Sequence, residues 1–212
     1  MRSALTSNVL RPRRPPMTTS DLVAAIRPVV EAFVALGVRH YLGGSVASSA
    51  HGIARASLDA DIVAELGPEH VSPLVERLSA DYYIPHERLR FAATSRSSCN
   101  FVHLATMFKI DVFVSKRRPF DLQAADRAQP QPLDEASETP LFFVASAEDT
   151  VLAKLEWFRL GGETSERQWW DIVGVLRVAN QTDRGYLRDW ARVLQVEDLL
   201  ERAFADAERG PA

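Results

Sequence analysis

The sequence predicts an α/β (α+β) fold in which a sheet-forming segment is followed by a bundle of helices. Between residues 18 and 145, stretches with helical spacing of apolar residues alternate with short stretches that alternate apolar and polar residues, as strands do. From Ser146 onward, every apolar stripe has helical spacing. The 212 residues are 46% hydrophobic and 25% charged, which suits one sizeable core or two small cores sharing a cleft and excludes collagen, long coiled coils and disorder throughout.

The sheet-forming segment begins with a helix, which Ser20 can cap and which ends at Gly37. Its apolar residues recur with a period near 3.6, as on one buried helix face. The pattern then predicts a strand at 38–42, a helix from Gly43 through His51, a strand at 58–66 and a helix at 69–80. An irregular or partly helical stretch at 84–98 precedes two strands, at 100–106 and 108–114.

A proline-rich stretch, residues 115–139, separates these elements from the helical remainder. It contains one short helix, expected at 120–128, and a last strand is expected at 141–145. Helices are then predicted at 148–160, 165–178, 184–194 and 197–208, each with a capping residue at its start. We therefore expect a disordered N-terminal arm over residues 1–17, a sheet domain over 18–145 and a C-terminal helical domain over 146–212.

Composition also bears on location and on cysteine chemistry. No apolar run approaches the roughly 18 residues of a membrane span, and the start of the chain lacks the apolar core of a secretory signal. We therefore expect a cytoplasmic protein with no membrane partner. The single cysteine, Cys99, permits no intramolecular disulfide and no cysteine-based zinc site.

The charge distribution argues against extensive nucleic-acid binding. The chain has 25 basic and 28 acidic residues, a net charge of −3. Because Arg2, Arg11, Arg13 and Arg14 all precede Met17, the remainder carries 21 − 28, or −7. A domain with this negative charge is not expected to wrap long nucleic acid, although a local basic patch could hold one RNA end. Only three of the basic residues are lysines, so Lys109, Lys116 and Lys154 are candidates for sites that need a compact ammonium group.

A strand-to-helix turn at Gly43-Gly44-Ser45 has the features of a phosphate cradle. Glycines let the backbone turn sharply and approach a ligand closely, and the amides of a helix N-terminus favour anions. The strand that follows carries Asp59 and Asp61 on one face, roughly 6–7 Å apart at the usual rise per residue. Two such carboxylates can bind divalent metal ions.

Asp111 is the candidate for a third carboxylate of this site. In the stretch 108–114, Ile110, Val112 and Val114 fill one face, whereas Lys109, Asp111 and Phe113 project from the other. If this strand pairs beside the strand of Asp59, the three acids converge on one cleft. Mg²⁺ prefers oxygen ligands and substrate phosphates, and Asp111 could also help to deprotonate an attacking hydroxyl.

These residues resemble the nucleotidyltransferase superfamily with the polymerase-β-like core. Its signature of Gly-Gly/Ser, a gap, Asp-x-Asp/Glu and a later lone Asp matches Gly43-Gly44-Ser45, Asp59-Ala60-Asp61 and Asp111 over residues 21–145, and Arg55 is similar to an Arg often found before the acidic pair. The helical remainder, with Lys154, Gly161-Gly162 and the stretch from Arg167 to Asp171, resembles small bacterial members related to AbiEii-type toxins. The resemblance implies a mixed sheet with helices on one side, followed by a helical bundle.

The resemblance further implies transfer of a nucleoside monophosphate from a nucleoside triphosphate (NTP) such as ATP to an acceptor hydroxyl, with Mg²⁺ or Mn²⁺ as cofactor. The acceptor would be a tRNA or another RNA end, as for a toxin with an antitoxin partner, and a protein or an aminoglycoside-like small molecule stays open. Asp59, Asp61 and Asp111 would bind metal and, with Lys154, form the catalytic set. The nucleotide-binding residues implied are Gly43, Gly44, Ser45, Arg55, Lys109, Arg167 and Asp171. Arg167 and Asp171 lie four residues apart, where a helix would let them pair.

Each motif also has a structural alternative. The glycine turn could be an ordinary strand-to-helix connection, the Asp-x-Asp pair the wet face of a strand, and Asp111 a charge that protects an edge strand. Lys154 could lie on a solvated helix face. We expect the four tryptophans, Trp157, Trp169, Trp170 and Trp190, to pack in the bundle or between domains, and His51 and His103 to be structural. For the whole chain, the alternative to an enzyme is a nucleotide-binding or partner-binding module of the same fold.

Overall fold

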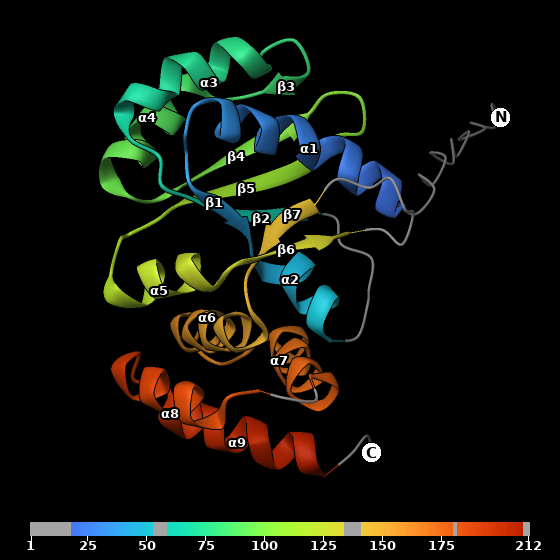
Figure 1. Cartoon of the computed structure of the whole chain (residues 1–212), viewed down its shortest axis with the longest axis vertical. Helices are drawn as coiled ribbons and strands as arrows, with labels where there is room; N and C mark the ends of the chain where they lie inside the picture. The colour runs from blue at the N-terminus through green and yellow to red at the C-terminus, as the bar shows by residue number, and fades with distance from the viewer. Residues whose placement is uncertain (1–17, 53–58, 134–140, 180–181, 210–212) are drawn as a thin grey trace, which may run out of the picture.

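The computed structural model describes residues 18–52, 59–133, 141–179 and 182–209. A mixed sheet crosses the middle of the molecule, with helices above and below it (Figure 1). Above it lie α1 (Thr19–Ala35), α3 (Val71–Leu78) and α4 (His86–Ser95), and a 3-10 turn, Pro68–His70, leads into α3. Below it lie α2 (Gly44–His51), α5 (Pro119–Arg127), α6 (Ala147–Leu160), α7 (Glu166–Val178), α8 (Arg184–Val193) and α9 (Glu197–Glu208). Among the described helices, none is long and apolar enough to span a bilayer.

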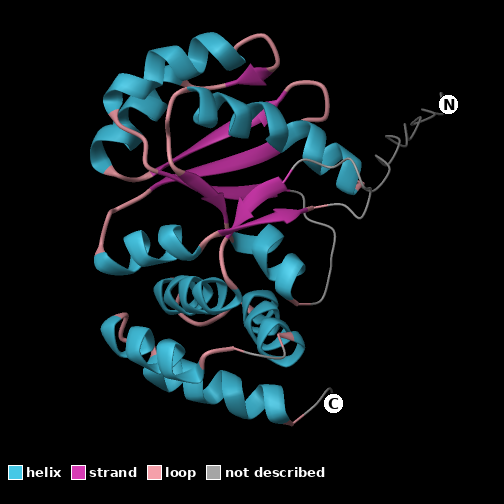
Figure 2. Cartoon of the chain, viewed as in Figure 1, coloured by secondary structure: helices cyan, strands magenta, loops and turns pink. Residues whose placement is uncertain are grey.

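The sheet has seven strands in the order β3-β4-β5-β2-β1-β7-β6. Figure 2 shows the strands in magenta, with helices on both sides of the sheet. Their bounds are β1 His40–Leu42, β2 Asp59–Ala64, β3 Tyr82–Tyr83, β4 Ser98–His103, β5 Phe108–Val114, β6 Gln129–Pro132 and β7 Leu141–Val144. The pairs β2–β5 and β1–β7 are parallel, and the other neighbours are antiparallel. The mixed α/β fold class expected from the sequence is confirmed.

The larger hydrophobic cluster lies between the sheet and the upper helices. Strand β5 shows why: Ile110, Val112 and Val114 are buried on its upper face, whereas the residues between them are only partly buried. On the other side of this cluster, α1 contributes Ile26 and Phe33, both fully buried. Burial of these side chains supplies the main stabilisation of this part of the molecule.

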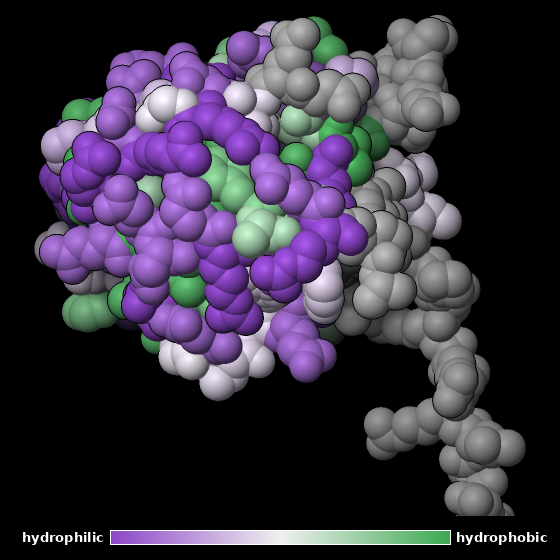
Figure 3. All heavy atoms as spheres, turned by 90° about the horizontal axis from the view of Figure 1, so that it is seen from below, coloured by the Kyte–Doolittle hydropathy of each residue, from purple (hydrophilic) through white to green (hydrophobic). Residues whose placement is uncertain are grey.

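A second hydrophobic cluster holds α6, α7, α8 and α9 together. It includes Phe120 and Ala124 of α5, so a helix that precedes residue 145 packs with the helical part. Outside this cluster, the ion pairs Arg184–Glu208, Arg188–Glu201 and Arg192–Glu197 lie on the surface of α8 and α9. That face of the molecule is mostly hydrophilic (Figure 3). Exposed pairs contribute little each, so the apolar cluster supplies most of the stability of the bundle.

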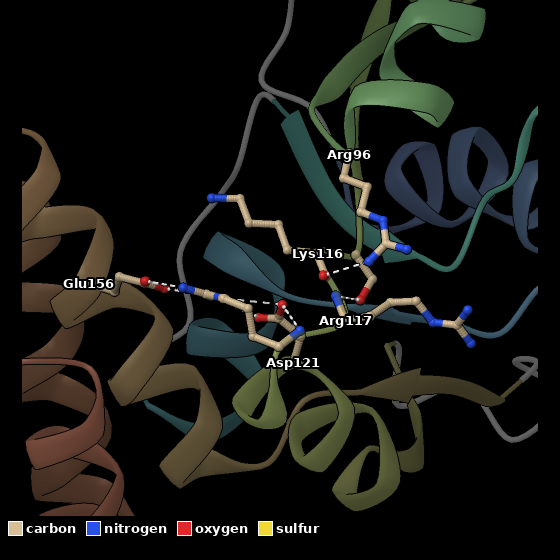
Figure 4. A network of polar contacts seen from close by, with 7 residues as sticks. Arg96, Lys116, Arg117, Asp121 and Glu156 are labelled. Atoms are coloured by element: carbon tan, nitrogen blue, oxygen red, sulfur yellow. Dashed lines mark hydrogen bonds and ion pairs between the residues drawn. The ribbon is translucent and has the colours of Figure 1, made fainter.

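Arg118, the residue that precedes α5, links the start of this helix to α6. Figure 4 shows the side chains of Asp121 and Glu156, which Arg118 contacts. Its guanidinium donates to both carboxylate oxygens of Glu156 on α6, at 2.5 and 3.0 Å. It also donates to Asp121, at 2.8 Å from Nη2 to Oδ1. A bidentate guanidinium–carboxylate pair fixes orientation as well as distance. This contact therefore holds α6 in a defined position below the sheet.

Most expected elements are present, with some corrections. Thr18 caps α1 in place of Ser20, because its side chain accepts from the amide of Asp21. The stretch 84–98 contains the regular helix α4, and two short strands, β3 and β6, were not expected. Helix α9 begins after Val196, which offers no side-chain cap.

The expectation for the tryptophans holds only in part. Trp169 is buried, as expected, but Trp157 and Trp170 are about half exposed, at 51% and 54%. Trp190 is partly buried against the second cluster. The N-terminal arm, residues 1–17, lies outside the described residues, and the division of the chain at residue 145 stays a prediction.

Candidate functional site

The turn between β1 and α2 brings a helix N-terminus against a carboxylate. Gly44, the first residue of α2, has a φ of +52°, which glycine adopts without strain. A Cβ at this position would lie 1.6 Å from Oδ2 of Asp61, so only glycine allows this approach. The amide of Ser45 faces the same oxygen at 3.4 Å, and the amide of Gly43 donates to the carbonyl of Asp61 at 2.9 Å.

The expected pairing of the acidic strands is confirmed. Asp61 of β2 lies directly beside Asp111 of β5 in the parallel register, and Asp59 lies beside Lys109. Paired residues of neighbouring strands point to the same face and are about 5 Å apart at the backbone. Both strands lie inside the sheet, between β4 and β1. Asp111 is therefore not an edge-strand charge, and that structural alternative is wrong.

The surroundings of the Asp61 carboxylate disfavour its charged form. Burial raises the pKa of Asp61, and the nearby carboxylates of Asp59 and Asp111 raise it further. The amide of Ser45 and the ammonium of Lys154 act in the opposite direction and lower this pKa. Such a group favours the neutral form, or a compensating cation beside it. Perturbed carboxylates of this kind are typical of functional sites.

Lys109 supplies part of that compensation. Its Nζ lies 2.6 Å from Oδ2 of Asp111 and 4.0 Å from Oδ2 of Asp59. The hydrogen bond to Asp111 is the main cause that raises the pKa of Lys109. The lysine side chain is 43% exposed, whereas that of Asp111 is 14% exposed. A solvent-accessible ammonium thus lies against an acid that is mostly buried.

Lys154 reaches the same region from α6 below the sheet. Its Nζ donates to Oδ2 of Asp171 on α7 at 3.0 Å. The two side chains are 10% and 12% exposed, so this ion pair is largely desolvated. The alternative of a solvated helix face for Lys154 is therefore wrong. Because the ammonium also lowers the pKa of Asp61, Lys154 lies within electrostatic reach of the carboxylates.

The structure thus brings together most of the residues that the sequence singled out: Gly43, Gly44, Ser45, Asp59, Asp61, Lys109, Asp111, Lys154 and Asp171. Arg55 lies outside the described residues. Arg167 is exposed in the first turn of α7, while Asp171 pairs with Lys154.

Three further residues lie near the site, and none of them was proposed as a site residue from the sequence. Asn100 of β4 lies beside Asp111 in the antiparallel register and is exposed. Phe113 lies in edge contact with Trp157 of α6, at 5.7 Å between ring centroids. The alternation along the strand at 108–114 placed Phe113 on the face of Lys109 and Asp111, and the burial pattern of β5 agrees. No local pattern could have indicated the other two.

The donors present suit a hard divalent cation. Oδ1 of Asp111 is buried and has no hydrogen-bond partner among the described residues. Within the described ranges, no three His, Cys, Asp or Glu side chains already form a metal-binding group. Mg²⁺ is commonly held by only one or two carboxylates together with substrate phosphates. The pair of Asp61 and Asp111, with one unsatisfied oxygen, fits that mode of binding.

Comparison with known proteins identifies similar folds. No family model and no curated protein matches the chain. Among solved structures, an antigenic nucleotidyltransferase-like protein from Paracoccidioides brasiliensis is similar with a TM-score of 0.56 and 15% identity, over 91% of this chain and 95% of that one. The antibiotic-resistance factor ANT(2'')-Ia is similar with a TM-score of 0.51 and 12% identity, over 91% and 97%. The chain therefore has a nucleotidyltransferase-like fold. The finer resemblance to AbiEii-type toxins stays a prediction.

Proposed function

We propose that this protein is a Mg²⁺-dependent nucleotidyltransferase that moves a nucleoside monophosphate from an NTP to an acceptor hydroxyl. The observation that carries the proposal is the register pairing of Asp61 with Asp111 beneath the N-terminus of α2. It joins two carboxylates, a set of helix amides and a lysine on a fold that nucleotidyltransferase-like proteins share.

In this proposal, Asp59, Asp61 and Asp111 bind Mg²⁺ or Mn²⁺. When bound, the ion supplies charge neutralisation for the phosphates and for the oxygens that attack and leave. The unsatisfied oxygen of Asp111 and the raised pKa of Asp61 support a cation at this position, because both would be relieved by it. The Asp-x-Asp pair then has a role beyond that of a solvated strand face.

The remaining residues bind the triphosphate. The amides of Gly44 and Ser45 would donate to phosphate oxygens at the helix N-terminus, with Gly43 shaping the turn. Lys154, oriented by Asp171, would offset charge on the leaving pyrophosphate. Arg55, Lys109 and Arg167 are proposed as further cations of the nucleotide site. The ion pair of Lys154 and Asp171 supports this role. Desolvation of two charges costs free energy, so a buried pair of this kind is weak evidence for a purely stabilising function.

The transfer of the nucleoside monophosphate needs only the NTP and the acceptor hydroxyl as reactants. The acceptor oxygen forms a bond to the α-phosphorus, and the bond from that phosphorus to the bridging oxygen of the β-phosphate breaks. Pyrophosphate leaves with the electron pair, and Asp111 takes the proton of the acceptor hydroxyl. In-line positioning and charge stabilisation account for most of the acceleration in this class of reaction.

Calorimetric titration with each NTP and Mg²⁺ tests the site. We expect metal-dependent binding of at least one NTP by the wild type, and its loss in the double variant Asp59→Ala/Asp61→Ala. Asp81→Asn, an exposed acid in the turn before β3, is the matched control and should bind as the wild type does. Failure of every NTP to bind, with the fold intact, would favour a partner-binding module over an enzyme.

The acceptor is then identified with the NTP that binds, labelled at the α-phosphate. Three acceptor classes follow from the proposal: a tRNA or other RNA end, an aminoglycoside-like small molecule, and a protein hydroxyl. Transfer to tRNA, together with growth arrest on expression and rescue by a neighbouring gene product, would identify a toxin with an antitoxin. Transfer to an aminoglycoside would indicate a role in antibiotic resistance, the role in which ANT(2'')-Ia is described.

A further inference from the structure

We propose that Lys109 is an internal counter-cation that occupies the carboxylate site until a divalent ion displaces it. The proposal rests on the function proposed above and goes beyond it, because it assigns Lys109 a role opposite to that of the other site lysine. Lys154 assists the bound substrate, whereas Lys109 competes with the metal.

The position of the ammonium supports competition. Nζ of Lys109 lies 2.6 Å from Asp111 and 4.0 Å from Asp59, so it stands between two of the three carboxylates that would bind the ion. It contacts Oδ2 of Asp111, while Oδ1 of the same carboxylate has no partner among the described residues. A cation that used both oxygens of Asp111 would have to share Oδ2 with the ammonium or remove it.

The two lysines of the site differ in their freedom to move. Lys154 is 10% exposed and is held by Asp171 from a neighbouring helix, so its position is fixed by packing. Lys109 is 43% exposed and extends from the open face of β5, near the start of the strand. A long side chain with half its surface in water can leave an ion pair and still keep its charge hydrated. Lys109 is therefore able to vacate the carboxylates when a stronger cation arrives.

Displacement has a consequence for the order of binding. Without nucleotide, a divalent ion gains the carboxylates but must expel an ammonium that already neutralises them, so free Mg²⁺ binds weakly. When the ion arrives with an NTP, phosphate oxygens complete its ligand set, and the released ammonium can pair with the added negative charge. The site is thus expected to load the metal–NTP complex and to discriminate against the free ion.

Mn²⁺ binding to the nucleotide-free protein tests this role, with free Mn²⁺ measured by its electron paramagnetic resonance signal. We expect Lys109→Met to lower the Kd for Mn²⁺ by about tenfold or more, equivalent to ~1.4 kcal/mol. Lys109→Arg keeps a cation at the site, so its Kd should stay near that of the wild type. Lys116→Met removes an exposed lysine beyond the end of the same strand and serves as the matched control.

Thermal unfolding provides a second readout that does not depend on activity. In EDTA, Lys109→Met should have a lower Tm than the wild type, because the carboxylates lose their counter-cation. Saturating Mn²⁺ should raise the Tm of this variant by more than it raises that of the wild type. Lys109→Gln gives the same comparison if the methionine variant does not fold.

Two outcomes would overturn the proposal and can be told apart. If Lys109→Met binds Mn²⁺ no more tightly than the wild type, while Asp61→Asn abolishes binding, the metal site stands and the role of Lys109 is wrong. If folded wild type and all Lys109 variants bind no Mn²⁺, the metal site of the proposed function fails as well.

Discussion

At the level of single residues, the approach of Gly44 to Asp61 is the tightest constraint in the site. We expect Gly44→Ala to destabilise the protein by about 1–3 kcal/mol and to abolish NTP binding, because the new Cβ would displace the Asp61 carboxylate and its residue would keep a positive φ. Chemical denaturation and NTP titration of the variant check both effects.

Gly37 offers a matched control for this prediction. It also has a positive φ, +67°, but no atom lies within 4 Å of the position that its Cβ would take. Gly37→Ala should therefore show the backbone cost alone, about 1 kcal/mol, with NTP binding intact. Equal effects of the two substitutions on NTP binding would contradict a specific role for the contact between Gly44 and Asp61.

Asp61 itself is expected to reduce stability. Because its pKa is raised in the folded protein, protonation stabilises the fold below the ordinary value of 3.8, and this contribution is lost as the pH rises through the raised pKa. In EDTA at neutral pH, Asp61→Asn should therefore raise the Tm by about 2–4 °C, the shift that ~1 kcal/mol produces at this chain length. The variant should be inactive.

The pH dependence separates this effect from a general change in packing. The difference in Tm between Asp61→Asn and the wild type should widen above pH 4 and close at more acidic pH. A difference that is constant with pH would show that the buried charge is not its cause. Stabilisation on removal of a functional carboxylate is a common sign that a site is organised for a ligand.

At the level of secondary-structure elements, a buried acid joins α5, α6 and α8. Asp149, 1% exposed near the start of α6, accepts from Arg127 of α5 at 3.1 Å and from the hydroxyl of Tyr186 of α8 at 2.5 Å. Tyr186→Phe leaves one oxygen of Asp149 without this donor, so we expect a loss of about 1–3 kcal/mol in unfolding free energy. Urea denaturation measures it, and Tyr83→Phe, an exposed tyrosine on β3, should change stability little.

Local patterns predicted the elements that carry a strong period and missed those that do not. Strand β5 was predictable, because its apolar residues alternate over seven positions and Asp111 interrupts only the open face. Strand β3 has two residues and β6 contains two prolines, so neither has a recognisable strand pattern. Their place in the sheet depends on pairing with β4 and β7.

The same limit applies to the candidate site. The alternation in each strand predicted the face on which Asp59, Asp61 and Asp111 lie, but the pairing of the two strands was only a condition for the site; the parallel register meets that condition. The partner of Asp171 was not predictable in this way. Its spacing from Arg167 favoured a pair within one helix, whereas the structure pairs it with Lys154, 17 residues away on another helix. Such a contact depends on how two helices pack together, and the local sequence of one helix does not predict it.

At the level of the whole molecule, the site draws on both hydrophobic clusters. Asp61 and Asp111 lie on strands of the first cluster, and Lys154 lies on α6, which packs in the second. A ligand that contacts both should stabilise the whole fold. We expect the NTP with Mg²⁺, at 100 times its Kd, to add about 2.7 kcal/mol to the unfolding free energy. Differential scanning calorimetry checks this.

The matching control uses the contact between Arg118, at the start of α5, and Glu156 of α6. Arg118→Met removes the bidentate contact with Glu156 but leaves every proposed ligand-binding residue in place. Its unliganded Tm should fall, and the increment produced by the NTP should remain. A ligand that stabilised the wild type but produced no increment in this variant would show that binding requires the contact between Arg118 and Glu156.

The two ends of the sheet limit how other chains can join it. The outermost strand on one side, β6, carries Pro130 and Pro132, which lack backbone N–H donors, and the outermost strand on the other side, β3, is two residues long. An incoming strand would find few donors and acceptors with which to extend the sheet. Edge-to-edge growth into fibres is therefore disfavoured, and a protein partner would have to recognise side-chain surfaces in place of exposed backbone.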